Sequence, residues 1–184
     1  IQSVADTVKA SPKKIVFAEG EQETVIRAAV QFYKEGYGTP ILVGREEKVS
    51  AAIEEIGLKE AKGIEIVNAS KSNKNHEYLE FLYKRLNRRG YLERDCQRLV
   101  NQDRNIFASC MVANGDADGL VTGSTRNYFV AYDDITRVID PAPKSRIFGM
   151  SIIMVEGRTL FVADTTVHYN PSSEELADIA CQTA

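Results

Sequence analysis

The sequence predicts an α/β fold, with a mostly parallel sheet flanked by helices. Short apolar runs alternate with longer segments whose apolar residues recur at helical spacing, in the order β-α-β-α-β-α-α-β-α over residues 14–139. Parallel strands need long crossover connections, and this alternation places a helix between successive strands. After prolines at positions 141 and 143 the pattern changes to two neighbouring apolar, β-branched runs. We therefore expect a second region to begin there.

Composition narrows the class of protein. The chain has 184 residues, 43% hydrophobic and 27% charged, which suits one sizeable core or two smaller lobes. A net charge of −3 argues against the positively charged surface that nucleic-acid binding needs. No apolar run reaches the length of a bilayer span. We expect a cytoplasmic protein with neither nucleic-acid nor membrane partners. Because the first residue is Ile1, we also expect a piece of a longer or processed chain.

The cysteines and histidines do not suggest a metal site. Cys96, Cys110 and Cys181 are odd in number and widely spaced, and His76 and His168 stand alone. Neither set has the spacing of zinc ligands or of a disulfide framework. We expect free, buried thiols and no metal on this chain.

The first part of the chain opens with a connector. Residues 1–13 are expected to link to a preceding domain and to contain a helical turn or two. The apolar run 14–18 predicts the first strand. Segment 21–35 carries apolar residues three and four positions apart and ends at a glycine, which predicts a helix. A glycine and a proline then lead into a second strand at 41–43.

The middle of the chain adds more helix than strand. Residues 46–56 predict a helix followed by glycine, and 64–67 predict the third strand. Segment 76–89 is a strongly periodic helix with arginines in its last turn, where cations stabilise the helix dipole. Asp95 is expected to cap a further helix that runs to about Asn114.

A strand-loop-helix unit carries the strongest functional signal. The strand 119–122 runs into the loop Gly123-Ser124-Thr125-Arg126, and a helix is expected over 125–139. Gly123 allows a tight turn, and Ser124 is expected to cap the helix. Arg126 adds a positive charge whose forked N–H donors suit phosphate or carboxylate. Free N–H groups at a helix start bind anions. We predict a phosphate-bearing ligand here, with a plain capped turn as the alternative.

Glu19 lies at the same predicted edge. It follows the first strand as Gly123 follows the fourth, and ligands of parallel sheets bind at the carboxyl ends of strands. We therefore include Glu19 among the candidate ligand-binding residues. The alternative is an acidic residue that only stabilises the dipole of the next helix.

The region after the prolines predicts a hairpin and a helix. Residues 146–155 and 159–163 are expected strands, and Ser172 with Glu175 forms a capping box for the last helix. Asp164, Thr165 and Asn170 gather hydrogen-bonding groups on the intervening loop, which predicts either ligand contacts or turn chemistry. We divide the chain into a first α/β lobe, 14–140, and the start of an incomplete second lobe, 141–184.

Several separated motifs resemble those of one family, the phosphate acetyl/butyryl transferases, and most closely the branch fused behind NADP-dependent malic enzyme. The resemblance covers nearly the whole chain from Lys13 on. The motifs are Val16-Phe17-Ala18-Glu19-Gly20-Glu21, Pro40-Ile41-Leu42-Val43-Gly44, Gly115-Asp116-Ala117-Asp118-Gly119 with Gly123, Arg137-Val138-Ile139-Asp140-Pro141, Phe161-Val162-Ala163-Asp164-Thr165-Thr166-Val167 and Glu174-Glu175-Leu176-Ala177-Asp178-Ile179-Ala180.

The resemblance implies a two-lobe fold like that of isocitrate dehydrogenase, with acyl-CoA and phosphate bound between the lobes. Family members transfer an acyl group between CoA and phosphate without metal, and their catalytic Ser-Arg pair and Asp are expected beyond Ala184. Catalytic residues on this chain are therefore unknown. Asp133 stands where many members carry an Arg used for CoA.

The fused branch implies a regulatory role. We expect an acetyl-CoA-sensing and oligomerisation module in a homo-oligomer, joined to an N-terminal malic enzyme domain. This piece needs no cofactor beyond an acetyl-CoA or phosphate ligand, while NADP and a divalent metal belong to the parent enzyme's other domain. Two alternatives stay open, namely an active phosphate acetyltransferase and a purely structural assembly domain.

Overall fold

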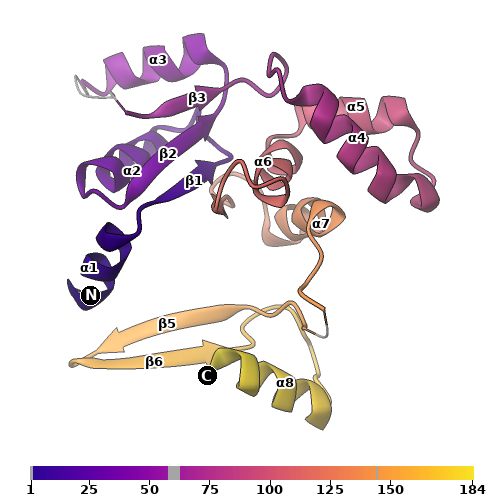
Figure 1. Cartoon of the computed structure of the whole chain (residues 1–184). Coiled ribbons are helices and arrows are strands. Elements are labelled where there is room, and N and C mark those ends of the chain that lie inside the picture. Colours follow the sequence, from indigo (N-terminus) through magenta and orange to yellow (C-terminus); the bar gives the residue numbers. More distant parts are fainter. Residues whose placement is uncertain (1, 58–62, 144) are drawn as a thin grey trace. The chain divides into compact units, whose positions relative to one another are not determined.

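A computed structural model describes residues 2–57, 63–143 and 145–184 (Figure 1). Residue 1 of the expected linker and residue 144 of the expected second lobe lie outside this description. The chain divides into two compact units, Ile1–Ile139 and Asp140–Ala184.

A four-stranded parallel sheet forms the centre of the first unit. Its strands are β1 (Lys13–Phe17), β2 (Gly38–Val43), β3 (Glu65–Val67) and β4 (Gly119–Val121), in the spatial order β3-β2-β1-β4. All three neighbouring pairs are parallel. The predicted α/β class with a parallel sheet is confirmed.

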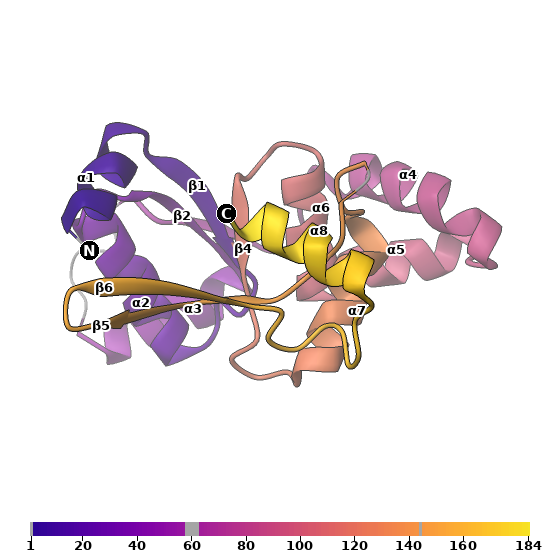
Figure 2. The same ribbon diagram turned by 90° about the horizontal axis from the view of Figure 1, so that it is seen from below.

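Helices cover both faces of this sheet. Figure 2 shows α2 and α3 on one face and α4 to α7 on the other. The helices of the first unit are α1 (Gln2–Ala10), α2 (Glu23–Lys34), α3 (Glu46–Glu55), α4 (Asn75–Leu86) with the 3-10 turn η1 (Asn87–Arg89), α5 (Glu93–Gln102), α6 (Arg104–Ala113) and α7 (Tyr128–Val138).

Two apolar clusters hold these layers together. Val16 and Ile41 point into the cluster shared with α4, α5 and α6, while Phe17 and Leu42 point into the cluster shared with α2 and α3. Adjacent strand residues therefore serve opposite faces, as the strand pleat requires. Burial on both faces explains why these strands read as continuous apolar runs.

The prediction of a single helix that runs to Asn114 is wrong. The helix is interrupted at Asp103, whose backbone is extended and whose side chain accepts the N–H groups of Asn105 at 2.9 Å and Ile106 at 3.1 Å. Asp103 is thus the N-cap of α6, and α5 ends one residue before it. A strong capping residue inside a continuous polar-apolar pattern divides one expected helix into two.

Other boundaries also differ from the prediction. Asp95 does not occupy the N-cap of α5; Leu92 does, and the Asp95 side chain accepts the Leu92 N–H at 3.1 Å. Strand β2 begins at Gly38, which pairs with Lys13, and it includes Pro40. The expected lead-in to β2 is therefore already part of the sheet.

The second unit consists of an antiparallel hairpin and one helix. Strands β5 (Met150–Val155) and β6 (Arg158–Ala163) pair along their length, and α8 (Ser173–Thr183) follows. The capping box is confirmed, because Ser172 N donates to Glu175 Oε2 at 2.8 Å and Glu175 N donates to Ser172 Oγ at 3.3 Å. The expected start of the first strand at residue 146 is wrong by four residues.

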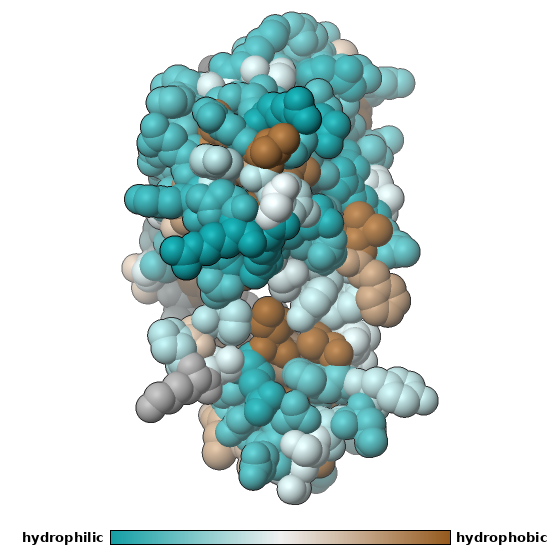
Figure 3. Space-filling view, turned by 90° about the vertical axis from the view of Figure 1, so that its right-hand side faces the viewer, coloured by the Kyte–Doolittle hydropathy of each residue, from teal (hydrophilic) through white to brown (hydrophobic). Residues whose placement is uncertain are grey.

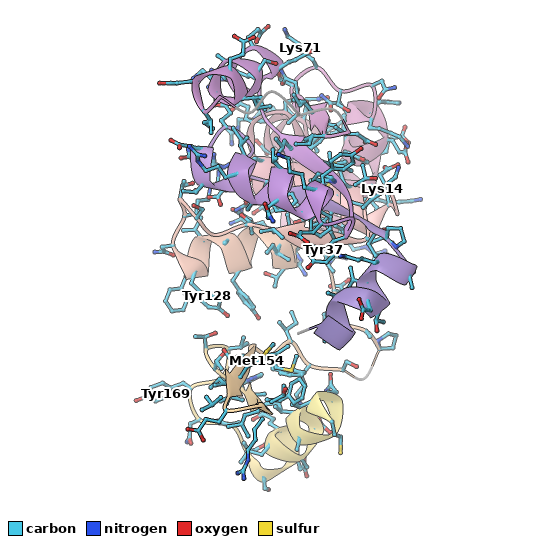
Figure 4. All side chains as sticks on the ribbon, turned by 90° about the vertical axis from the view of Figure 1, so that its left-hand side faces the viewer. Lys14, Tyr37, Lys71, Tyr128, Met154 and Tyr169 are labelled. Carbon is cyan, nitrogen blue, oxygen red and sulfur yellow. The ribbon has the colours of Figure 1, made fainter. Side chains whose placement is uncertain are left out.

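Apolar side chains of the hairpin are exposed along its length. Tyr169, in the loop after β6, is fully exposed and points away from the hairpin (Figure 4). The partly exposed apolar side chains of the two strands are Met150, Ile152, Ile153, Met154, Val155, Leu160, Phe161 and Val162.

Elsewhere the surface is ordinary. Hydrophilic residues cover most of the face of the first unit seen in Figure 3. Among the described residues no helix is long and apolar enough to cross a membrane.

Two of the three cysteines are buried, as expected. Cys96 and Cys110 are buried free thiols, whereas Cys181 is exposed. Burial raises the pKa of the Cys110 thiol to about 12.

Candidate anion-binding site

The carboxylate of Glu19 fills the loop that follows β4. Glu19 Oε2 accepts the backbone N–H of Ser124 at 2.6 Å, and Glu19 Oε1 accepts the Thr125 N–H at 2.6 Å and the Thr125 hydroxyl at 2.5 Å. Glu19 is only 2% exposed. The N–H groups expected to point outward toward a ligand are therefore already bonded to a carboxylate of the same chain.

The pairing of β1 with β4 creates this contact. Phe17 lies opposite Val121 in the register, so the residues that follow the two strands meet at one edge of the sheet. Gly20 lets the chain turn close to β2 just after Glu19, because a Cβ there would lie 2.8 Å from the carbonyl oxygen of Val43. The sheet thus fixes Glu19 beside the loop.

Hydrogen bonds hold Glu19 in its ionised form. Burial alone would raise its pKa, but the bonds from Thr125 and Ser124 and the charge of Arg104 outweigh burial, so the pKa lies below its ordinary value. The guanidinium Nη2 of Arg104 lies 3.7 Å from Glu19 Oε1. The edge of the sheet therefore carries a carboxylate that is ionised at neutral pH and whose hydrogen-bond partners lie within the chain.

Ser124 is not the helix cap that the sequence suggested. Helix α7 begins at Tyr128, and its N-cap is Asn127, whose side chain accepts the Val130 N–H at 3.1 Å. Gly123 has φ +105°, a backbone conformation that favours glycine, and it starts the loop. Ser124 contributes its backbone N–H to Glu19 rather than its hydroxyl to the helix.

Arg126 also forms its ion pairs within the chain, with Asp103 and Asp134. Its Nη1 lies 2.7 Å from Asp103 Oδ2 and 2.6 Å from Asp134 Oδ2. Asp134 is buried and accepts a further hydrogen bond from Asn105 Nδ2 at 3.1 Å, and Asn105 accepts one from the Thr122 hydroxyl at 2.7 Å. This buried network joins the loop to α6 and α7.

An open polar pocket lies next to the loop 123–126, whose N–H groups are bonded to Glu19. Its volume is about 380 Å³, and it lies where β2 and β3 end, against the junction of α5 and α6. The residues that line it are Glu21, Val43, Gly44, Arg45, Asn68, Ala69, Ser70, Asn101, Gln102 and Arg104. Sequence reasoning singled out none of the arginines and asparagines here, because they come from separate elements.

The second unit contains one carboxylate, Asp164, that accepts several hydrogen bonds. Asp164 accepts backbone N–H groups from Gly149 at 2.9 Å and from Thr166, Val167 and His168 at 3.2, 3.1 and 2.7 Å. Its Oδ2 also lies 2.6 Å from His168 Nδ1. Burial would raise the pKa of Asp164, but these bonds hold it well below its usual range.

The other predicted residues of that loop make fewer contacts. Thr165 is exposed and donates its N–H to the carbonyl of Gly149 at 3.1 Å, and Asn170 is exposed. His168, which appeared isolated in the sequence, is the unexpected partner of Asp164. The expected ligand role of Asp164, Thr165 and Asn170 stays a prediction, as does that of Glu19 and residues 123–126.

The two predicted site regions belong to different units of the chain. Glu19 and the loop 123–126 come together in the first unit, and Asp164, Thr165 and Asn170 lie in the second. In the described parts of the chain no group of three or more His, Cys, Asp or Glu residues is arranged to hold a metal ion.

Comparison with known proteins agrees with this architecture. A family model for phosphate acetyl/butaryl transferase matches residues 1–184. The chain belongs to this family. It is 51% identical over 185 residues to the NADP-dependent malic enzyme of Rhizobium meliloti and 32% identical over 192 residues to the phosphate acetyltransferase of Clostridium acetobutylicum.

Solved transferase structures share the fold. A phosphotransacetylase from Streptococcus pyogenes superposes on 98% of this chain with a TM-score of 0.87 and 26% identity, and the chain covers 56% of it. The phosphate acetyl/butaryl transferase family resemblance inferred from separated motifs is therefore confirmed. The chain spans 24% of the length of the Rhizobium enzyme and 57% of the Clostridium enzyme, whereas both similarities cover the whole of this chain.

Proposed function

We propose that this chain is the phosphate-acetyltransferase-like domain of an NADP-dependent malic enzyme, and that it binds acetyl-CoA as a regulatory and oligomerisation module. The observation that carries the proposal is the 51% identity to a malic enzyme along the entire chain, against 32% to a phosphate acetyltransferase. The parent enzyme would convert malate to pyruvate and CO₂, with NADP and a divalent metal on its other domain.

The geometry at the sheet edge disfavours a catalytic phosphate site at the loop 123–126. The donors of the loop 124–125 are bonded to Glu19, and Arg126 is paired with Asp103 and Asp134. Asp133, which stands in place of a CoA-binding Arg, forms an ion pair with Arg137. A carboxylate at that position repels a CoA phosphate and weakens binding in the mode used for catalysis.

A second candidate function is phosphate acetyltransferase activity. It is favoured by the 32% identity to the Clostridium enzyme and by the shared fold of solved phosphotransacetylases. In that case the intact domain would transfer the acetyl group of acetyl phosphate to CoA and release phosphate. The third candidate, a purely structural assembly domain, would bind neither substrate.

Two measurements distinguish these functions: thermal unfolding of this chain and a transferase assay of the intact domain. We expect acetyl-CoA to raise the melting temperature of the chain, because a ligand that binds only the native state must stabilise it. We expect no CoA-dependent consumption of acetyl phosphate by the intact domain. Measurable turnover would favour the transferase, and the absence of both binding and turnover would favour the structural module.

A further inference from the structure

Positive charge gathers where α4 ends and α5 begins. Segment 84–98 carries six basic residues and two acidic ones, so its net charge is +4, whereas that of the whole chain is −3. This surface, named the basic corner below, consists of the basic residues Lys84, Arg85, Arg88, Arg89, Arg94 and Arg98 and the acidic residues Glu93 and Asp95.

The carboxylates near the basic corner neutralise little of this charge. Asp95 Oδ1 lies 4.0 Å from Arg98 Nη2, and Asp95 Oδ2 accepts the N–H of Leu92 at 3.1 Å. Glu80 on α4 lies 3.2 Å from His76. Within the described residues no ion pair is formed by Lys84, Arg88, Arg89 or Arg94.

Helix dipoles explain only part of this charge. Lys84 stands in the last turn of α4 and Arg89 in the following turn η1, where cations are favourable. Arg94 stands in the first turn of α5, where the dipole disfavours a cation. The stability of α5 therefore does not account for Arg94.

The outer face of α3 has the opposite charge. Val49 and Ile53 turn the inner face of this helix into the core. The cations beside the outer face are Lys71, which lies 3.8 Å from Glu47, and the pair Arg45 and Lys48, which bind Glu21. Four of the ten residues of α3 are exposed glutamates, namely Glu46, Glu47, Glu54 and Glu55.

The last turn of α3 carries charge that its own helix disfavours. Glu54 and Glu55 stand at the C-terminal end, where the dipole favours cations, and that turn contains no basic residue. In the described part of the chain neither glutamate forms an ion pair. Both α3 and α5 thus carry an exposed charge that opposes the dipole of its own helix, and the two charges have opposite signs.

A single copy of the chain does not bring these two surfaces together. Figure 1 shows α3 at one end of the first unit and the α4–α5 pair at the other. A contact between glutamates of α3 and the basic corner therefore requires two copies. Because the two surfaces differ, such a contact is heterologous and either closes into a ring or continues as a chain of copies.

The basic corner also has the composition of a protein interface. Tyr83 and Leu92 expose apolar side chains on the same elements, and a small anion would leave these in water. Arginine and tyrosine are enriched where proteins meet, and guanidinium groups bind carboxylates through paired N–H donors. An open pocket of about 450 Å³ lies in this surface, lined by Arg89, Gly90, Tyr91, Asp95, Arg98, Leu99 and Arg137.

We propose that the outer face of α3 of one copy docks on the basic corner of a second copy of this chain. Glu54 and Glu55 supply the negative charge, and Arg89 and Arg94 receive it. Exposed ion pairs are individually weak, so the association is expected in the micromolar range. This interface specifies the oligomerisation part of the proposed function and rests on it.

Sedimentation of the 184-residue chain over a range of concentrations tests the association. Salt screens exposed charges, so raising NaCl from about 20 mM to about 500 mM is expected to weaken the association at least ~10-fold. A chain that stays monomeric up to about 100 µM at low salt would overturn both this interface and the oligomerisation part of the proposed function.

Charge reversals test the interface by itself. Arg94→Glu and Glu54→Arg each suit the dipole of their own helix better, so both variants are expected to fold, which circular dichroism checks. Each alone is expected to weaken the association at least ~10-fold, because like charges then face each other. Arg158→Glu, on the exposed start of β6, is the matched control and leaves the association unchanged.

A mixture of the two variants gives the most specific result. One variant keeps the acidic face of α3 and the other keeps the basic corner, so an equimolar mixture is expected to associate although each variant alone does not. Association that neither reversal weakens, or a mixture that stays as weak as its components, would overturn the interface and leave the proposed oligomerisation standing.

Discussion

The carboxylate of Glu19 accepts the backbone N–H of Ser124 at 2.6 Å, although the two residues are 105 positions apart. The bond joins the end of β1 to the end of β4. It places a negative charge where the sequence suggested a bound phosphate, so the anion-binding geometry of the loop serves the fold itself. Arg45 and Arg104 line the neighbouring pocket instead.

Replacement of Glu19 tests how much this contact stabilises the first unit. Glu19→Gln removes the charge and turns one acceptor oxygen into a donor that faces backbone N–H groups. We expect the free energy of unfolding to fall by about 1–3 kcal/mol, measured by urea denaturation followed by circular dichroism. Glu23→Gln, on the exposed start of α2, is the control with a change near zero. Equal stability of the two variants would show that Glu19 holds nothing in place.

Acid is expected to destabilise the protein. The pKa of Glu19 lies below its ordinary 4.5, and hydrogen bonds from the Arg45 side chain lower the pKa of Glu21 to about 2. Between pH 4.5 and 2 the unfolded chain binds more protons than the folded one. The stabilisation that these two carboxylates provide is therefore fully present above about pH 5 and is lost as the pH falls from 4.5 toward 2.

Each such group contributes a slope of up to about 1.4 kcal/mol per pH unit. Glu21→Gln is therefore expected to flatten the dependence of unfolding free energy on pH between 4.5 and 2. The measurement is a series of urea denaturations at pH 6, 4 and 3. A parallel decline in the variant and the parent chain would exclude Glu21 as a source of the acid sensitivity.

Adjacent aspartates on α7 separate buried from exposed charge. Asp134→Asn weakens the acceptor of Arg126 and Asn105 in the buried network, and we expect a loss of about 2 kcal/mol in unfolding free energy. Asp133→Asn affects only an exposed pair with Arg137, so a loss below about 0.5 kcal/mol is expected. If thermal denaturation ranked the two variants in the reverse order, the network would not be the main tie between the loop and α7.

The start of α7 gives a further prediction. Asn127→Ala removes the side-chain cap and is expected to cost about 1 kcal/mol, whereas Ser124→Ala leaves the backbone bond to Glu19 intact and costs little. Thermal unfolding of both variants checks this. A larger loss from Ser124→Ala would restore Ser124 as the cap.

The fold was largely predictable because its signals are local. Apolar runs and helical periodicity each lie within one segment, and they indicated every strand of the parallel sheet. The break at Asp103 was missed because polar residues on both sides continue the helical pattern, although Asp103 itself is a strong N-cap. Here one side chain, through two hydrogen bonds, decides where α6 begins.

The site was only partly predictable. Glu19 and Gly123 could be placed at the carboxyl edge of a sheet, but not beside each other, because strand order depends on packing of the whole unit. The pocket draws Arg45, Asn68 and Arg104 from three separate segments, and no spacing rule connects them. The family resemblance, by contrast, rests on several motifs in order along the chain and was confirmed.

The most direct test of the regulatory proposal is malate-dependent NADP reduction by the full-length parent enzyme, with and without acetyl-CoA, followed together with its assembly state. Acetyl-CoA can act only by binding one state better than another, so we predict a change in rate, in oligomer distribution, or in both. An unchanged rate and an unchanged assembly state at saturating acetyl-CoA would contradict it.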